Sequence, residues 1–328
     1  MLYPLTFRPI FKERVWGGRN LERIYRKPLP PDIPIGESWE ISDRPGDVSV
    51  IANGPLAGKD LHWLMQHHAK ELLGDARLTD GRFPLLIKIL DAEEKLSLQV
   101  HPPAHKAAEL GGEPKTEMWY IADAKPGAEL YVGLKRGVTR AEFERKIKTG
   151  EISDCFHRVK VKAGDVMFLP SGRVHAIGEG MVIFEIQQNS DTTFRVFDWN
   201  RIGLDGKPRA LHIPESLASI DFDDFEPEVI PSTSGAQQLL SGKSVGRQIV
   251  NCALFDVVRF DFESAGSMLL NLDELRIIGV ISGRVTVTDG KQAPELDAGD
   301  FCLVPAKLKS SEVWFEASTT FLSIGIGK

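Results

Sequence analysis

The sequence is poor in cysteine, has no long apolar run and carries no excess of positive charge. Cys155, Cys252 and Cys302 form no Cys-x-x-Cys pair, so they indicate neither a disulfide framework nor a thiolate zinc site, and we expect buried thiols. No segment approaches the roughly 20 consecutive apolar residues of a membrane span. The first residues lack the apolar core and small-residue exit of a signal peptide. These absences predict no membrane partner and a cytoplasmic location.

The charge balance also excludes one class of partner. The 328 residues carry 40 Lys and Arg against 46 Asp and Glu, a formal net charge of −6. This balance provides no overall attraction to nucleic acid, so we expect none as a partner. A small neutral or anionic substrate needs only a local basic site. The length suggests about two domains, each large enough to bury a core.

Gly and Pro divide most of the chain into short segments of alternating apolar and polar residues, such as LSLQVHP, TEMWYIAD and GDVMFLPS. This pattern favours a mainly β protein built from antiparallel barrels or sandwiches. Two segments, at about 60–75 and 139–150, have helical spacing instead. Thr139 and Glu142 are spaced as a capping box at the start of the second. We expect both segments to be helical insertions in the N-terminal half.

The composition changes near residues 221–238, where an acidic stretch is followed by one rich in Ser, Gly and Pro. Such a stretch is typical of a linker. We therefore predict a first domain at 1–228, a linker at 229–238 and a second domain at 239–328. The order of strand, Gly-rich turn and strand recurs in the second domain, which indicates two related barrels.

Alternation gives three of the predicted strands one polar face each. The polar faces carry Ser97, Gln99 and His101; Lys115 and Glu117; and Glu185 and Gln187. A solvated outer face is the commoner explanation for any single strand of this kind. Three such strands, each bearing groups that bind metals or move protons, favour a shared site instead.

The segment GDVMFLPSGRVHAIG predicts a strand that ends at Pro170, turns tightly through Gly172 and delivers His175 into the next strand. The spacing of Gly, Pro, Gly and His matches the second cupin motif, and QVH with a later Glu resembles the first. Gln99 stands where the first histidine of that motif is usual. Glu179 occupies the usual terminal Asn position of the second motif. The segments therefore resemble a cupin metal site with an altered ligand set.

Gln99, His101, Glu117 and His175 would supply two oxygen and two nitrogen donors to one cation. This donor set suits a borderline divalent ion such as Zn²⁺, one per chain, and leaves coordination positions for water or substrate. A hydrogen-bonded core histidine is the alternative explanation for His101 taken alone.

Nearly the whole chain resembles the type I mannose-6-phosphate isomerases (phosphomannose isomerases) of the short bacterial form. The segments that carry the resemblance are RPIFKERVWGG, GESWEIS, FPLLIKILDAEEKLSLQVHPP, PKTEMWY, SGRVHAIG and QNSDTTFRVFDW. The resemblance implies two cupin-type (jelly-roll) β-barrels, a zinc ion and interconversion of mannose 6-phosphate and fructose 6-phosphate. The residues of the second barrel predict no metal there, because no histidine follows Pro305.

The family's metal ligands carry over onto the same four residues, Gln99, His101, Glu117 and His175. The resemblance further implies an essential Arg195, a site Glu185, site lysines at Lys88 and Lys115, and a contact of Ser97 with the substrate phosphate.

The chemistry of aldose–ketose isomerisation explains why such residues are needed. Arg195 can stabilise the oxyanion of an enediol intermediate, with a surface salt bridge as the alternative. Glu185 suits a base if burial raises its pKa, and a desolvated Lys115 or Lys88 titrates closer to neutrality and suits an acid. The sequence does not choose among these three.

Other functions stay open from the sequence. The same metal site would serve an isomerase of another sugar or sugar phosphate, an iron-dependent oxygenase, or a catalytically silent sugar-binding cupin. The oligomeric state, monomer or homodimer, is also open.

Overall fold

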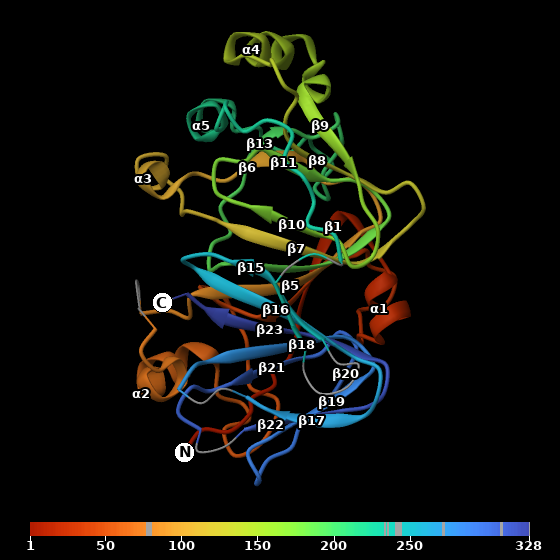
Figure 1. Cartoon of the computed structure of the whole chain (residues 1–328). Helices are drawn as coiled ribbons and strands as arrows, with labels where there is room; N and C mark the ends of the chain where they lie inside the picture. Colours follow the sequence, from red (N-terminus) through yellow and green to blue (C-terminus); the bar gives the residue numbers. More distant parts are fainter. Residues whose placement is uncertain are drawn as a thin grey trace. The chain divides into compact units, whose positions relative to one another are not determined.

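The computed structural model describes residues 1–76, 81–232, 234, 236–239, 245–270, 273–308 and 311–327. The chain forms two compact units, each discontinuous in sequence (Figure 1). Unit 1 comprises Met1–Ile10, Trp39–Lys88 and Thr233–Lys328, and unit 2 comprises Phe11–Ser38 and Ile89–Ser232.

Unit 2 is built around two sheets. The first contains β1 (Ile10–Gly18), β2 (Ile35–Ile41), β5 (Leu85–Ala92), β7 (Glu117–Ala124), β10 (Val166–Leu169) and β12 (Met181–Gln188), in the order β1-β2-β5-β12-β7-β10. The second contains β6 (Leu98–Val100), β8 (Glu129–Leu134), β9 (Phe156–Lys160), β11 (His175–Ile177) and β13 (Phe194–Phe197), in the order β13-β6-β11-β8-β9. The boundaries with unit 1 fall inside β1, β2 and β5.

An apolar core joins the two sheets of unit 2. Trp119 and Ile121 of β7 belong to the same buried cluster as Leu130 and Val132 of β8. These residues occupy alternate positions of their strands, so one face of each sheet is buried against the other. Side chains on these inner faces are therefore shielded from water unless they lie at the end of the sandwich.

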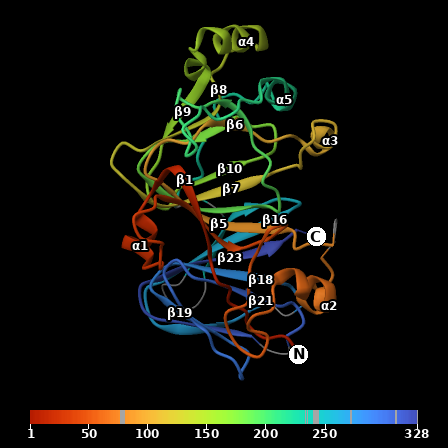
Figure 2. The same cartoon turned by 180° about the vertical axis from the view of Figure 1, so that it is seen from behind.

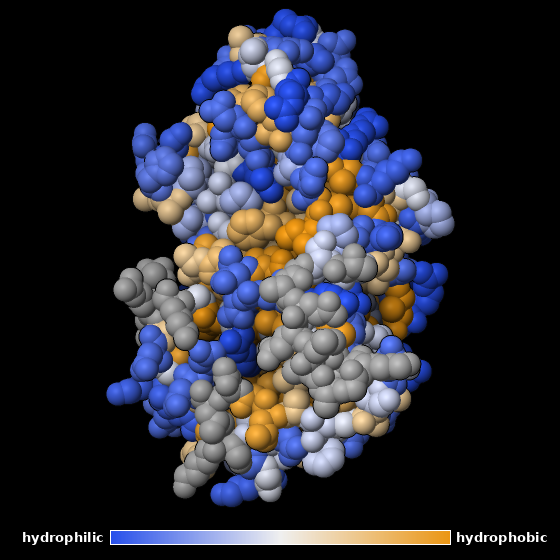
Figure 3. Space-filling model, viewed as in Figure 1, coloured by the Kyte–Doolittle hydropathy of each residue, from blue (hydrophilic) through white to orange (hydrophobic). Residues whose placement is uncertain are grey.

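Helices cover the other face of the second sheet. Leu98 of β6 and Phe194 of β13 share a second cluster with Phe143 of α4 and Leu217 of α5. Figures 1 and 2 agree that α4 and α5 lie on the side of β6 and β13 away from β7 and β10. Hydrophilic side chains surround α4 at the top of Figure 3. The helices of unit 2 are α1 (Asn20–Tyr25), α3 (Ala104–Ala107), α4 (Arg140–Thr149), the 3₁₀ turn η1 (Ile152–Cys155) and α5 (Ile213–Ser219).

Unit 1 contains two further facing sheets. Val280 and Phe321 of the larger sheet share a buried cluster with Val287 and Val313 of the smaller one. The larger sheet contains β14 (Ala236–Leu239), β15 (Val245–Asn251), β16 (Phe255–Phe262), β18 (Arg276–Ser282), β21 (Phe301–Val304) and β23 (Thr319–Ile326), in the order β14-β15-β16-β23-β18-β21. The smaller contains β17 (Gly266–Leu269), β19 (Arg284–Thr288), β20 (Glu295–Asp297) and β22 (Glu312–Phe315), in the order β17-β22-β19-β20. The helix α2 (Leu61–Leu73) and the short pair β3 (Asp43–Arg44) and β4 (Asp47–Val48) complete the unit.

The mainly β class and the two predicted helices are confirmed. Asp60 caps α2 by accepting a hydrogen bond from Trp63 N, and Thr139 caps α4 by accepting one from Glu142 N. Non-helical backbone at His68 interrupts α2.

The predicted linker at 229–238 is only partly covered by described residues. Ile230 forms an antiparallel bridge with Val166, and β14 begins at Ala236. Residues 233 and 235 lie outside the described part.

Two further expectations concern thiols and membranes. Cys155 and Cys302 are buried free thiols, whereas Cys252 is partly exposed, which corrects the expectation of three buried thiols. Among the described residues, no helix has the length and apolar character that crossing a bilayer requires.

Candidate metal centre and active site

The second sheet of unit 2 brings three predicted site residues onto one face. On β6, Gln99 lies directly opposite His175 of β11 on one side and Arg195 of β13 on the other. Directly opposed residues of antiparallel strands point to the same face. Since Leu98 and Val100 pack into the helix-covered core, this polar face is directed at the first sheet.

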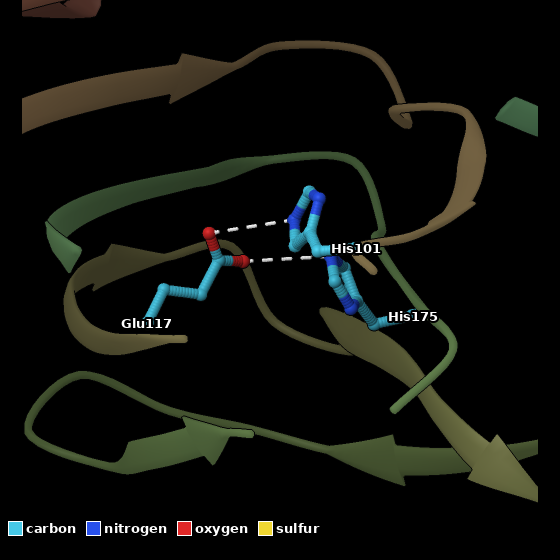
Figure 4. A group of neighbouring side chains, drawn as sticks. All are labelled: His101, Glu117 and His175. Atoms are coloured by element: carbon cyan, nitrogen blue, oxygen red, sulfur yellow. Dashed lines mark ion pairs between the residues drawn. The ribbon is translucent and has the colours of Figure 1, made fainter. Parts of the chain in front are cut away.

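Glu117 approaches the same place from the first sheet. It begins β7, and His101 directly follows β6. Glu117 Oε2 lies 3.6 Å from His101 Nε2, and Glu117 Oε1 lies 3.4 Å from His175 Nε2 (Figure 4). Gln99 Nε2 lies 3.3 Å from His175 Nε2. The four residues proposed from alternation therefore converge on one point between the sheets.

Burial excludes the explanation that His101, Glu117 and His175 lie on a solvated outer face, whereas Gln99 beside them is half-buried. His101, Glu117 and His175 are each at most 1% exposed. The side chains of one sheet face those of the other, and the apolar cluster around Trp119 closes the interior beside them. Polar groups in such a place require partners, because burying an unpaired polar atom costs free energy.

The electrostatics of the cluster favour a carboxylate beside neutral imidazoles. Burial raises the pKa of Glu117, but the Lys115 ammonium and the two histidines outweigh that effect and hold its pKa well below the ordinary value. Burial, assisted by the charge of Lys115, lowers the pKa of His101 to about 4. Burial also lowers the pKa of His175. Ionised carboxylate and neutral imidazole are the forms that bind metal ions.

Lys115 lies against this carboxylate. Its Nζ is 2.7 Å from Glu117 Oε2. Burial lowers the pKa of Lys115, but the carboxylates of Glu117 and Glu185 more than offset burial and raise its pKa above the ordinary value. The premise that desolvation brings Lys115 closer to neutrality is therefore wrong for this structure, because its carboxylate partners stabilise the ammonium form.

Glu185 and its strand neighbour Gln187 share the inner face of the first sheet with Glu117. Glu185 lies opposite Trp119, and Gln187 lies opposite Glu117. The Glu185 carboxylate accepts a hydrogen bond of 3.0 Å from Trp119 Nε1. Because the Trp119 ring also meets His175 edge-on, the indole connects Glu185 to the histidine cluster.

Protein partners use only part of the hydrogen-bonding capacity of the Arg195 guanidinium. One guanidinium nitrogen donates to Ala210 O at 2.9 Å, while its Nε is buried without a hydrogen bond in the described part of the chain. No ion pair of Arg195 occurs among the described residues, so the structure does not support the surface salt-bridge alternative.

The last two predicted residues occupy different units. Ser97 is buried in unit 2, and its hydroxyl lies 3.5 Å from Gln99 Oε1. Lys88 is buried in unit 1, where its Nζ lies 5.1 Å from the centroid of the Trp39 ring.

Sequence reasoning missed the groups that orient the two histidines. His101 Nδ1 lies 2.8 Å from Thr192 O, and His175 Nδ1 lies 2.9 Å from Arg173 O. Both acceptors are backbone carbonyls, which every residue type carries. No side-chain pattern could therefore have revealed them.

The donor set fits a metal ion. Ligand atoms of His101, Glu117 and His175 all lie within 4.8 Å of one another. His101 Nε2 and Glu117 Oε1 are buried and have no hydrogen bond within the described residues. A cation bound between them would satisfy both atoms, and rotation of the Gln99 amide would present an additional oxygen.

Comparisons with known proteins identify the family of this chain. A family model described as the catalytic domain of type I phosphomannose isomerase matches residues 5–145. Mannose-6-phosphate isomerase ManA of Bacillus subtilis (strain 168) is 37% identical over 307 residues, which cover 92% of this chain and 93% of that protein. The chain belongs to the type I phosphomannose isomerase family.

Further family members extend over the same length. A mannose-6-phosphate isomerase of Streptococcus mutans serotype c is 35% identical over 311 residues, covering 94% of this chain and 95% of that protein. The crystal structure of the mannose 6-phosphate isomerase from Bacillus subtilis matches with a TM-score of 0.87 and 31% identity, covering 99% of this chain and 100% of the other. The similarity to this phosphomannose isomerase therefore includes both units.

Proposed function

We propose that Gln99, His101, Glu117 and His175 bind one zinc ion per chain at the centre of a mannose-6-phosphate isomerase active site. Membership of the family makes the chain an aldose–ketose isomerase that interconverts mannose 6-phosphate and fructose 6-phosphate. The observation that carries the metal proposal is the buried convergence of His101, Glu117 and His175. Two imidazoles with oxygen donors are the usual ligands of a catalytic zinc, and they leave open positions.

The reaction moves a proton between two neighbouring carbons and places negative charge on oxygen in the enediol. Zinc, when bound, polarises a substrate oxygen and stabilises that charge. Arg195 is on the same strand face as Gln99 and His175, and its guanidinium is suited to the developing oxyanion because it does not give up its proton. Lys115, held as an ammonium by Glu117, adds positive charge at the same place.

The group that transfers the proton is proposed to be Glu185. Its carboxylate is buried on the inner face of the first sheet, and Trp119 Nε1 holds it in place. The raised pKa of Lys115 keeps that lysine an ammonium near neutral pH, which makes it a poor proton donor and disfavours the acid role expected from desolvation. For Lys88, we keep the proposal from the family resemblance that it is a lysine of the active site.

The remaining features belong to the same proposal. Ser97, buried beside Gln99, would contact the phosphate of a hexose phosphate substrate. The facing sheets of each unit are proposed to be cupin-type jelly-roll barrels. Along the chain, the proposed order is a first domain at 1–228, a linker at 229–238 and a second domain at 239–328, which differs from the grouping of segments into the two units. A cytoplasmic monomer or homodimer is the expected form.

A coupled assay tests the activity and its metal dependence together. Purified protein is expected to convert mannose 6-phosphate to fructose 6-phosphate, to lose that activity on chelation and to regain it with zinc. The zinc proposal is wrong if the chelated, metal-free protein keeps its full rate.

The competing functions give different results with the same protein. A silent sugar-binding cupin would bind zinc and hexose phosphate but would not exchange the C2 proton of mannose 6-phosphate with solvent deuterium. An oxygenase would consume oxygen and work with iron. An isomerase of another sugar phosphate would prefer that substrate in kcat/KM.

A further inference from the structure

We propose that Thr192 and Gln187 are positioning residues that fix the tautomer and orientation of His101. The inference rests on the proposed metal site, since it concerns the presentation of one of its ligands. Among the described residues, neither side chain forms a hydrogen bond with His101, Glu117 or His175. Both instead hold the turn at residues 188–192, which comprises the end of β12 and the irregular segment before β13 and supplies a backbone acceptor to His101.

The contact between His101 and this turn selects one tautomer. His101 Nδ1 lies 2.8 Å from the carbonyl oxygen of Thr192. A carbonyl oxygen only accepts, so Nδ1 carries the proton and Nε2 keeps its lone pair. That Nε2 atom faces Glu117 and has no hydrogen bond within the described residues. The Thr192 carbonyl therefore prepares the nitrogen that would bind metal.

The side chain of Thr192 anchors its own carbonyl. Glu113 N donates to Thr192 Oγ1 at 2.9 Å. On the other side, Thr192 N donates to Ser190 Oγ at 3.3 Å. The Thr192 methyl lies so close to Gly112 that a Cβ on that glycine would be 2.7 Å away. Two hydrogen bonds and one close packing contact thus hold this residue.

Gln187 attaches the same turn to the first sheet. Its amide nitrogen donates to Ser190 O at 2.5 Å and to Gln188 O at 2.9 Å. The side chain is fully buried, and Gln187 lies directly opposite Glu117 in the pairing of β12 with β7. Gln187 therefore connects the turn that contacts His101 to the strand pair that carries Glu117. This connection fixes the position of His101 relative to Glu117.

The second histidine provides an internal reference, because separate contacts hold it. His175 Nδ1 lies 2.9 Å from Arg173 O. Arg173 is fixed by two hydrogen bonds to Asp224, at 2.8 and 2.7 Å. A change in the turn at 188–192 is therefore expected to alter His101 and to leave His175 unchanged.

The decisive experiment compares Thr192→Val with Thr193→Val. Valine keeps the shape of threonine but cannot accept from Glu113 N. The Thr193 hydroxyl has no hydrogen bond in the described part of the chain, which makes it a matched control. Zinc affinity is measured by competition with a chelator, and the imidazole tautomers are read by ¹⁵N NMR of the metal-free protein.

We expect Thr192→Val to weaken zinc binding by about 10- to 100-fold. It should also diminish the signal of the protonated Nδ1 of His101 and leave that of His175 unchanged. Gln187→Met, which removes both amide donors at similar length, should show the same two effects. Thr193→Val should match the unsubstituted protein in both readouts.

The outcomes separate this inference from the proposed function. If the unsubstituted protein binds no zinc, the proposed function fails, while the NMR signal of His101 still tests the role of the turn. The inference is overturned if Thr192→Val and Gln187→Met fold, bind zinc as tightly as the unsubstituted protein and keep its His101 tautomer. It is also overturned if His175 changes as much as His101.

Discussion

Arg195 and Asp198 lie three positions apart and illustrate two uses of charge at the scale of the residue. Arg195 has a buried Nε with no hydrogen bond in the described part of the chain, so its guanidinium has capacity for a ligand. Asp198 is fully engaged, because Arg201 and Arg209 both donate to it. Arg195 is therefore the residue proposed for chemistry, and Asp198 joins Arg201 and Arg209 in the segment that follows it.

Replacement of Arg195 by Ala is expected to lower kcat by about 10²-fold or more, by analogy with the removal of an oxyanion donor. Zinc content and the unfolding transition should stay unchanged, because Arg195 is not among the proposed ligands and its one described side-chain bond is to Ala210 O. Steady-state kinetics with metal analysis provides the check. A kcat near that of the unsubstituted enzyme would exclude this role.

Asp198→Asn is expected to lower the free energy of unfolding at pH 7 by about 1–3 kcal/mol. Burial raises the pKa of Asp198, but hydrogen bonds from Arg209 and Arg201 prevail and lower it below the ordinary 3.8. The contribution of the carboxylate is therefore present above pH 3.8 and is lost as the pH falls through the lower folded-state pKa. Urea unfolding of both proteins from pH 7 to pH 3 should show the difference shrinking below 3.8. A difference that stays constant would contradict the assignment.

At the scale of the element, capping explains where the two long helices begin. Asp60 has extended backbone and accepts from Trp63 N at 2.7 Å, and Thr139 does the same for Glu142 N at 3.2 Å. Each side chain satisfies a backbone N–H that the first turn of a helix leaves free. The strands require no such residue, because hydrogen bonds to a neighbouring strand satisfy their backbone N–H and C=O groups.

Asp60→Ala is expected to destabilise the protein by about 1 kcal/mol, because the helix loses its cap and a favourable charge at its N-terminus. Thr139→Ala should cost less, since its hydrogen bond is longer and uncharged. Asp60→Asn keeps an acceptor and serves as the control. Equal stability of Asp60→Ala and Asp60→Asn in urea would show that the cap contributes nothing.

At the scale of the whole molecule, metal binding is expected to be linked to folding. Glu117, His101 and His175 come from both sheets of unit 2, so an ion between them would bind only when the sheets are assembled. A ligand that binds only the native state stabilises it by mass action.

Removal of zinc is therefore expected to destabilise the protein, by about 2.7 kcal/mol when the zinc concentration had been 100-fold above Kd. Urea unfolding with and without a chelator measures the difference. His175→Ala, which removes a proposed ligand, is the control. Its free energy of unfolding should be lower than that of the unsubstituted protein and should not change when the chelator is added. An identical response of both proteins to the chelator would refute the linkage.

The division into units shows a limit of sequence reasoning at this scale. The composition near residues 221–238 predicts one boundary, and unit 2 ends at Ser232, within the predicted linker. Met1–Ile10 and Trp39–Lys88 nevertheless group with the C-terminal residues. Local composition cannot predict this grouping, because the grouping depends on contacts between segments that are distant in sequence.

By itself the sequence determined the strand periods, the helix starts and the polar faces, since each follows from spacing within one segment. It therefore selected Gln99, His101, Glu117 and His175, which the structure places beside one another. Only the tertiary structure decided that these faces are interior and that Lys115 is paired with Glu117. It also decided which carbonyls orient the histidines. Burial, pairing and backbone hydrogen bonds between distant segments arise from packing, and no single segment encodes them.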